Sequence, residues 1–161
     1  MKDLQKLAQE CIADLTAVGI RIRTVRNWKV GTKKRNLWGL CETVGDGVFD
    51  IRISELLLQD DIDGQQVKNT IAHELLHTVE GCMNHGRYWH RLARLVNDRC
   101  PQYRIKGRTS AEEKGIHITY KYILRCTGCG AEAGRHRRSR FVDHPEKYIC
   151  SKCGGKFKRI K

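Results

Sequence analysis

Residues 73–77 have the sequence His-Glu-Leu-Leu-His, which limits the folds open to this chain more than any other segment. In an α-helix, two histidines four residues apart are offset by only about 40° and about 6 Å. Both imidazoles can therefore bind one metal ion from one face of the helix. Glu74 lies beside them but points away, so it suits a base acting on metal-bound water better than a ligand. The spacing predicts a zinc hydrolase.

The flanking residues predict a helix over 64–80 with one buried side. Asp63 and Gln66 resemble a capping box, with an acidic N-cap and a glutamine at the third helical position. The two histidines fall outside the apolar arc, which argues against a helix whose histidines bind nothing. The apolar residues recur at the helical period, at Val67, Ile71, Ala72, Leu75, Leu76 and Val79.

A third ligand has to come from beyond this helix. In an unbroken helix, Glu80 would lie about 10 Å along the axis from His73, too far to share an ion. Gly81 provides a C-terminal stop, after which the chain can turn and bring back His85. His90 is the alternative, but it falls inside a second helix expected over 87–99. We therefore predict that the catalytic zinc is held by His73, His77 and His85.

Three neutral imidazoles leave a fourth position for water, as in catalytic zinc sites. Zinc would lower the pKa of that water toward about 7, and Glu74 would accept its proton and pass it to the leaving amine. The sequence does not single out a second group that would stabilise the oxyanion, since Tyr88, Tyr103 and His90 are equal candidates.

Two Cys-x-x-Cys pairs, at 126–129 and 150–153, are separated by twenty residues, which is typical of a zinc ribbon. About forty residues cannot build much of a core, so this fold would depend on four thiolates closing on one ion. A redox dithiol fits poorly, because both pairs are present and no βαβ pattern surrounds them. We predict a structural zinc held by Cys126, Cys129, Cys150 and Cys153.

Composition narrows the class of protein. A chain of 161 residues can form one modest core and a small appendage. It contains no apolar run long enough to span a membrane, and its first residues lack the apolar segment of a signal peptide. Four of the eight cysteines form the two pairs, which indicates a reducing compartment. We expect a cytoplasmic protein without a membrane partner, nucleoid-associated if bacterial and nuclear if eukaryotic.

The formal net charge is +13, and residues 121–161 hold twelve Lys or Arg against three Asp or Glu. Such a surplus predicts contact with a polyanion through counterion release, although solubility alone is the alternative. Aromatic residues are interleaved with the basic ones, and some could stack on unpaired bases, although Tyr122 and Tyr148 are expected to pack the ribbon itself. The predicted nucleic-acid contacts are Arg135, Arg137, Arg138 and Arg140.

The pattern as a whole predicts an α+β fold, with helices packed on a small antiparallel sheet and a C-terminal zinc ribbon. We expect a catalytic core over 1–105, a polar linker over 106–119 and the ribbon over 120–161. A basic turn is expected at Lys33–Arg35. The remaining elements expected in the core are a helix from residue 4 to near Gly19, strands over 20–29, 36–44 and 48–53 with a turn at 45–47, and a short helix over 54–58.

In this order, the motifs resemble those of the SprT-like metalloproteases, a group that includes bacterial SprT and eukaryotic Spartan. The matching segments are Trp38–Cys41, Phe49–Ser54, His73–His77, His85-Gly86 with Trp89, Arg135–Arg137 and Tyr148–Gly155. The resemblance implies a compact zincin core in which His73, His77 and His85 bind zinc and Glu74 is catalytic. For the Spartan branch it further implies a DNA-activated protease that digests proteins crosslinked to DNA.

The function expected from the sequence is thus a zinc metalloendopeptidase with one catalytic and one structural zinc ion. Its expected partners are single-stranded or damaged DNA and the proteins bound to that DNA, in the manner of DNA–protein crosslink repair. One alternative is a non-enzymatic nucleic-acid-binding protein whose first metal site is structural or vestigial. Another is a zinc hydrolase that acts on something other than protein. Glu74 argues against the vestigial site, because a structural site has no use for a base.

Overall fold

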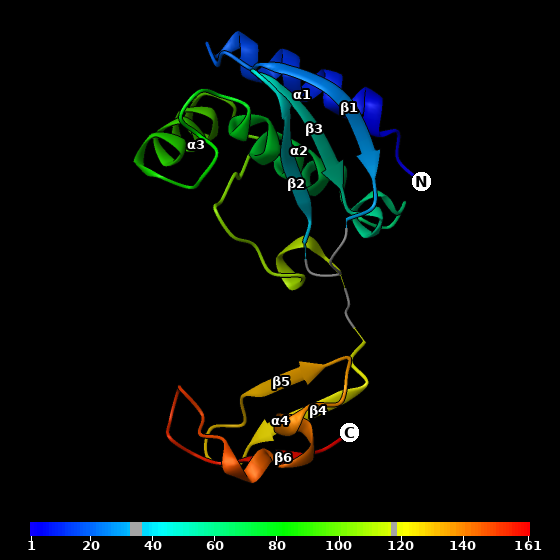
Figure 1. Cartoon of the computed structure of the whole chain (residues 1–161), viewed down its shortest axis with the longest axis vertical. Helices are drawn as coiled ribbons and strands as arrows, with labels where there is room; N and C mark the ends of the chain where they lie inside the picture. Colours follow the sequence, from blue (N-terminus) through cyan, green and yellow to red (C-terminus); the bar gives the residue numbers. More distant parts are fainter. Residues whose placement is uncertain (33–36, 117–118) are drawn as a thin grey trace. The chain divides into compact units, whose positions relative to one another are not determined.

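The computed structural model describes residues 1–32, 37–116 and 119–161, and the chain divides into two compact units, 1–117 and 118–161. Both units are built from short helices and a three-stranded sheet (Figure 1), so the chain is α+β as predicted. The basic turn expected at Lys33–Arg35 lies outside the described residues.

The boundaries of two elements in the first unit differ from those expected. The motif helix ends at His77 rather than at residue 80. The next residue, Thr78, caps the helix, and its hydroxyl donates to the Leu75 carbonyl at 2.7 Å. The first strand begins at Thr24 rather than at residue 20, because the Ile20 N–H closes a turn on Leu15. In chain order the elements are α1 Leu4–Ala17, β1 Thr24–Val30, β2 Gly39–Gly45, β3 Val48–Ile53, η1 Glu55–Leu58, α2 Gly64–His77, α3 Arg87–Arg99 and η2 Glu112–Lys114.

The sheet of the first unit has the strand order β1-β3-β2 and is mixed. The tight turn between β2 and β3 makes these two strands antiparallel neighbours, but β1 pairs with β3 in parallel. The prediction of an antiparallel sheet was therefore wrong for β1. Two strands joined by a tight turn pair as an antiparallel hairpin. Strands β1 and β2 are joined instead by the eight residues 31–38, so they need not be neighbours, and β3 lies between them.

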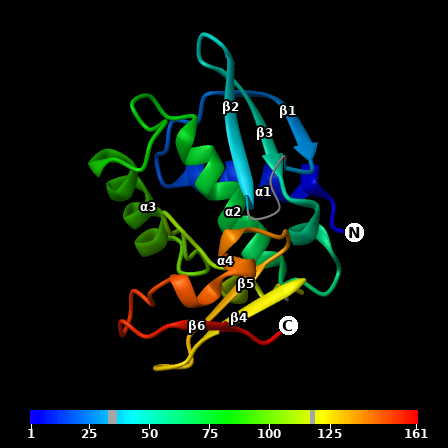
Figure 2. The same cartoon turned by 60° about the horizontal axis from the view of Figure 1, so that its bottom comes forward.

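Helices α1 and α2 cover the inner face of this sheet, where Phe49, Ile51 and Ile53 of β3 are buried. Each helix begins at an aspartate whose carboxylate accepts a backbone N–H of the first turn, Asp3 for α1 and Asp63 for α2. Strand β2 is an edge strand that lies beside α2 (Figure 2). The edge of the sheet is therefore next to the motif helix.

The chain after α3 returns across the first unit instead of leaving it. Asn97 holds Ile105 by two hydrogen bonds, from its amide to the Ile105 carbonyl at 3.0 Å and from the Ile105 N–H at 2.8 Å. Ala111, Lys114 and Ile116 are all buried. The predicted linker was therefore wrong over residues 106–116, because these side chains pack on the core.

The second unit has a small antiparallel sheet of order β5-β4-β6. Among the residues described between 119 and 161, only four side chains are buried: Leu124, Cys126, Val142 and Cys150. No helix in the described parts of the chain is long and apolar enough to cross a bilayer. The elements of this unit are β4 Tyr122–Cys126, β5 Glu132–Arg135, α4 Arg140–Asp143, η3 Pro145–Lys147 and β6 Phe157–Arg159.

Candidate metal centre

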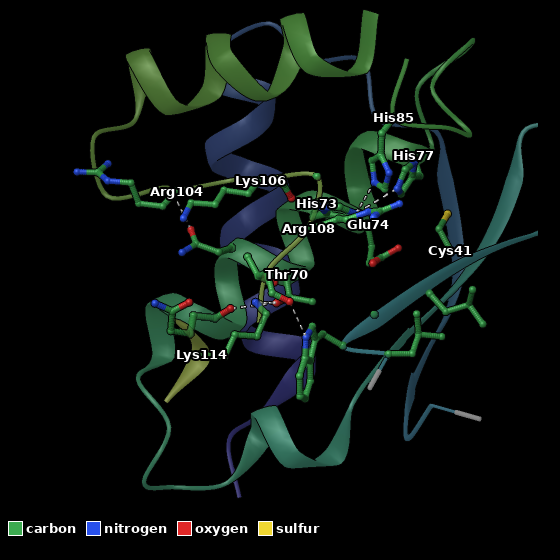
Figure 3. Close-up of a pocket in the computed structure, with 18 of the residues that line it drawn as sticks. Cys41, Thr70, His73, Glu74, His77, His85, Arg104, Lys106, Arg108 and Lys114 are labelled. Carbon is green, nitrogen blue, oxygen red and sulfur yellow. Dashed lines mark hydrogen bonds between the residues drawn. The ribbon is translucent and has the colours of Figure 1, made fainter. Parts of the chain in front are cut away.

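Helix α2 and the turn that follows it bring three imidazoles together (Figure 3). Gly81, with a φ of 75°, reverses the chain so that His85 returns toward the helix. The Nε2 atom of His73 lies 3.2 Å from that of His77 and 2.9 Å from that of His85. Nitrogens bound at about 2.0–2.1 Å to a tetrahedral zinc ion lie about 3.3 Å apart. The three residues therefore fit as ligands of one zinc ion.

Backbone carbonyls orient two of these rings. The Nδ1–H of His73 donates to Lys106 at 2.9 Å, and that of His77 donates to Cys82 at 2.7 Å. Each ring thus turns its Nε2 lone pair toward the shared point, in the tautomer that binds metal. Burial lowers the pKa of all three imidazoles, that of His73 to about 3, which keeps them in the neutral form that a metal ion requires.

Trp89 packs against all three imidazoles. Its side chain is fully buried, and its ring centroid lies 4.8 Å from that of His73, 5.6 Å from His77 and 4.5 Å from His85. The indole N–H has no hydrogen-bond partner among the described residues. Trp89 therefore acts on this centre through packing, which restricts the directions that the imidazoles can take.

Glu74 is buried beside the histidines and against strand β2. Its side chain packs so closely on Gly39 that a Cβ atom there would lie 2.6 Å from Glu74 Cγ. Burial raises the pKa of Glu74 to about 8, opposed by the positive charge of Lys114 and by a hydrogen bond from the Cys41 N–H. A carboxyl group with a pKa near neutrality can both accept and release a proton.

The imidazoles and Glu74 face a cavity of about 470 Å³ whose walls come from α2, β2 and the segment after α3. The third wall, which includes Arg108 and Lys114, was not predicted from the sequence, because a polar and turn-rich stretch resembles a linker. The Trp38 indole N–H donates to the Thr109 carbonyl at 3.2 Å and so ties this wall to the entry of β2. No signal in the sequence alone marks these two cations as cavity residues.

None of the three residues considered as oxyanion donors lines this cavity. Tyr103 is buried, with its hydroxyl donating to Asp14 at 2.8 Å, and Tyr88 lies on the exposed side of α3. His90 packs on the edge of Trp89 and is not part of the histidine cluster. Glu80, which the helix spacing disfavoured as a ligand, pairs instead with Arg23 at 2.9 Å.

The four paired cysteines form a second cluster, in the second unit. The Sγ atoms of Cys126 and Cys153 are 3.4 Å apart, and those of Cys129 and Cys150 are 3.7 Å apart. Zinc bound to four thiolates at about 2.3 Å would place the sulfurs about 3.8 Å apart. All four ligand atoms lie within 4.8 Å of one another, so this set also suits one zinc ion and leaves no open position.

Glycines bring backbone N–H groups to this cysteine cluster. The N–H of Gly128 donates to Cys126 Sγ at 3.4 Å, and that of Gly155 donates to Cys153 Sγ at 3.4 Å. A Cβ atom at Gly155 would lie 2.9 Å from Cys126 Sγ, so only glycine allows this approach. Hydrogen bonds from the N–H groups of Cys129 and Gly128 lower the pKa of the Cys126 thiol, which favours the thiolate that binds metal.

The four arginines predicted to contact nucleic acid are all exposed, but they differ in their partners. Arg135 lies over the Phe141 ring at 5.0 Å, and Arg138 pairs with Asp143 at 2.6 Å. Arg137 and Arg140 make no side-chain hydrogen bond or ion pair with the described residues. The structure thus places all four basic side chains on the surface of the ribbon.

Of the interleaved aromatic residues, Phe141 packs within the ribbon, with its ring centroid 4.8 Å from that of Tyr148 and 5.1 Å from that of Phe157. Tyr120 packs against His136, with ring centroids 5.0 Å apart. These aromatic side chains therefore contribute to the ribbon's own packing, as was expected for Tyr148.

Comparison with known proteins agrees with this architecture. Residues 120–161 match the SprT-like zinc ribbon domain. Over 95 residues the chain is 34% identical to "Protein SprT-like" from Bacillus subtilis (strain 168), a match that covers 58% of this chain and 56% of that protein. The chain thus spans little more than half the length of this relative. No solved structure matches the chain.

The chain is thus similar to the SprT-like proteins, through its ribbon and through the 95 residues that match the Bacillus protein. The histidine cluster and the cysteine cluster both have the composition and spacing of zinc sites.

Proposed function

We propose that this chain is a zinc-dependent metalloprotease with a zincin core, which hydrolyses peptide bonds of proteins bound or crosslinked to DNA. The observation that carries the proposal is the convergence of three imidazole Nε2 atoms beside the buried carboxyl group of Glu74, in one open cavity. A structural metal site needs neither an adjacent base nor a cavity for substrate.

In this proposal, His73, His77 and His85 hold the metal ion and Glu74 moves the proton. When bound, the zinc ion acidifies water and polarises a carbonyl group. Glu74 accepts a proton at its carboxylate and later releases it to the leaving amine; burial, which raises the pKa of Glu74, favours its accepting the proton. Gly39 leaves room for the carboxyl group, and the Cys41 N–H directs it.

The ribbon is proposed to hold the enzyme on DNA, so that proximity rather than a deep side-chain pocket selects the protein substrate. Its support is the charge of residues 121–161, with twelve basic residues against three acidic ones. Arg135, Arg137, Arg138 and Arg140 would contact phosphates and release counterions. Binding should therefore weaken as salt rises. The enzyme would work in the cytoplasm or the nucleoid of a bacterium, or in a nucleus.

A cleavage assay with the zinc-loaded protein and a DNA-binding protein as substrate tests this function. We expect cleavage that increases when single-stranded DNA is added. Glu74→Gln should lower the rate by a factor on the order of 10²–10⁴, the usual contribution of a positioned general base. Glu80→Gln is the matched control, because Glu80 pairs with Arg23 outside the cavity, and we expect it to keep the wild-type rate.

Absence of cleavage under every condition, with zinc bound, would favour the non-enzymatic nucleic-acid-binding protein. Cleavage that is indifferent to DNA would remove the proposed role of the ribbon. Cleavage by Glu74→Gln at the wild-type rate would remove Glu74 from the mechanism.

A further inference from the structure

Lys114 is a lysine in an unusual place. Its side chain is only 3% exposed, although it belongs to the 3-10 helix η2 in a polar segment. Among the described residues no carboxylate forms an ion pair with it, and its one hydrogen bond runs from Nζ to Thr70 Oγ1 at 2.6 Å. Burying an ammonium group without a carboxylate partner costs free energy.

The ammonium group of Lys114 has hydrogen-bonding capacity to spare. An ammonium group carries three N–H donors, and the contact with Thr70 uses one. Burial lowers the pKa of Lys114 to about 8, a value that still leaves the group mostly charged at neutral pH. The other two N–H donors of this charged group therefore have no acceptor among the described residues.

Lys114 lies close to the proposed reaction centre. Thr70 precedes Glu74 by one turn of α2, so the two side chains share a face of the helix about 6 Å apart. Lys114 and Glu74 line the same cavity (Figure 3). Side chains on one face of an extended peptide recur every 6.6 Å or so. A peptide held at Glu74 could thus place a side chain at Lys114 within about two residues of the cleaved bond.

Positive charge dominates the wall on which Lys114 lies. Glu74 is the one acidic residue among the described side chains that line the cavity. Two of the cations there have partners, since Lys106 pairs with Glu113 at 2.6 Å and Arg104 donates to backbone carbonyls. Arg108 and Lys114 are left without a carboxylate partner in the described parts of the chain. The cavity therefore favours the binding of an anionic substrate group and disfavours the binding of a cationic one.

We propose that Lys114 and Thr70 form a subsite for the carboxylate of an acidic substrate side chain, located within about two residues of the scissile bond. The free donors of the ammonium group bind the carboxylate, while Arg108, an exposed cation that also lines the cavity, adds attraction. This inference rests on the proposed proteolysis, and it adds a preference for substrates with an acidic side chain near the cleaved bond. No sequence motif indicates it, because η2 lies in the stretch that resembles a linker.

Matched peptides that differ only in glutamate or glutamine near the cleaved bond test the subsite. For the wild-type protein we expect kcat/KM to be about tenfold higher for the glutamate peptide, the effect of one charge-assisted hydrogen bond. Lys114→Met keeps an unbranched side chain but removes the charge, so it should lower kcat/KM for the glutamate peptide about tenfold more than for the glutamine peptide and so abolish the preference. Lys68→Met is the matched control, since Lys68 lies on α2 outside the cavity and pairs with Glu10.

A binding measurement separates failure of the subsite from failure of the proposed protease. Zinc-loaded Glu74→Gln protein is titrated into labelled alanine–glycine peptides with a single central glutamate or glutamine, and fluorescence anisotropy is recorded. We expect tighter binding of the glutamate peptide, and loss of that difference when Lys114→Met is added. This result would support the subsite even if the wild-type protein cleaved nothing.

Equal binding of the two peptides would overturn the inference, as would a preference that survives in Lys114→Met. An equal loss of activity on both peptides would show that Lys114 serves only to balance the charge of Glu74. Thermal melting checks that Lys114→Met is folded, and Lys114→Gln, which keeps a polar contact with Thr70, replaces it if it is not.

Discussion

The two metal centres of this chain differ in how far the fold around each one depends on its metal ion. The histidine centre lies on a unit with its own core, in which Ile51, Leu75 and Trp89 are completely buried. The cysteine centre lies in a unit where two of the four buried side chains described are themselves cysteines. The first unit can therefore hold its ligands without the ion, whereas the second depends on the ion to hold its strands.

The contacts of the ligands show the same difference. Backbone carbonyl groups and the Trp89 ring hold the imidazoles in place, so the orientation of these ligands comes from the protein itself. In the ribbon, N–H groups of Gly128 and Gly155 point at sulfur atoms, an arrangement that stabilises thiolates. Four thiolates close together repel one another unless a cation is present. Zinc should thus supply chemistry in the first unit and folding free energy in the second.

The largest expected effect is on the ribbon when one of its ligands is removed. Cys126→Ser should leave residues 119–161 unfolded, because structural zinc contributes on the order of 10–16 kcal/mol to such modules. Hydrogen exchange should show rapid exchange throughout this region, while the amides of α2 and β3 stay protected. Protected ribbon amides in the zinc-free variant would contradict the comparison.

The counterpart on the other centre is His73→Ala. It should abolish zinc binding at the histidine cluster and leave the buried amides of the first unit protected, since Lys106 and Trp89 keep their other contacts. Metal analysis should find two ions per wild-type chain and one in each of the two variants. Collapse of the first unit in His73→Ala would show that zinc holds that fold as well.

A smaller effect is expected from Gly39→Ala, which tests how tightly the first unit positions its base. The added Cβ would lie 2.8 Å from Glu74 Cδ, so the carboxyl group must move. We expect the free energy of unfolding to fall by about 1–3 kcal/mol, with a loss of cleavage activity. Gly45→Ala is the control, because its Cβ would meet Val48 at an ordinary 3.7 Å. Equal stability of the two variants in urea denaturation would show that Glu74 is loosely held.

The smallest effect is expected from Glu132→Gln in the ribbon. Glu132 pairs with Arg125 at 2.6 Å across β4 and β5, but the two side chains remain 46% and 49% exposed. Exposed pairs contribute about 0–1 kcal/mol, and salt screens them. Thermal melting of the zinc-loaded protein should therefore hardly change, least of all in 1 M NaCl. A large destabilisation would show that surface contacts share the role assigned to zinc.

Much of the secondary structure could be predicted because its signals are local. Apolar period and caps predicted the three long helices of the first unit, and the tight turn predicted the β2–β3 hairpin. The direction of β1 could not be predicted, since it depends on which neighbour the strand finds after a long connection. Residues 106–116 were misassigned because their few apolar side chains, such as Ile116, give no periodic signal.

By itself, the sequence determined the chemistry available to this protein. The spacing of His73 and His77 follows from the helix pitch, and two Cys-x-x-Cys turns specify four thiolates, so these ligand sets needed no knowledge of the fold. Only the tertiary structure decided what surrounds them: the Lys106 carbonyl on His73, Gly39 against Glu74, and Lys114 buried beside Thr70. These contacts join residues far apart in the chain, and burial and charge at such places arise from packing rather than from local spacing.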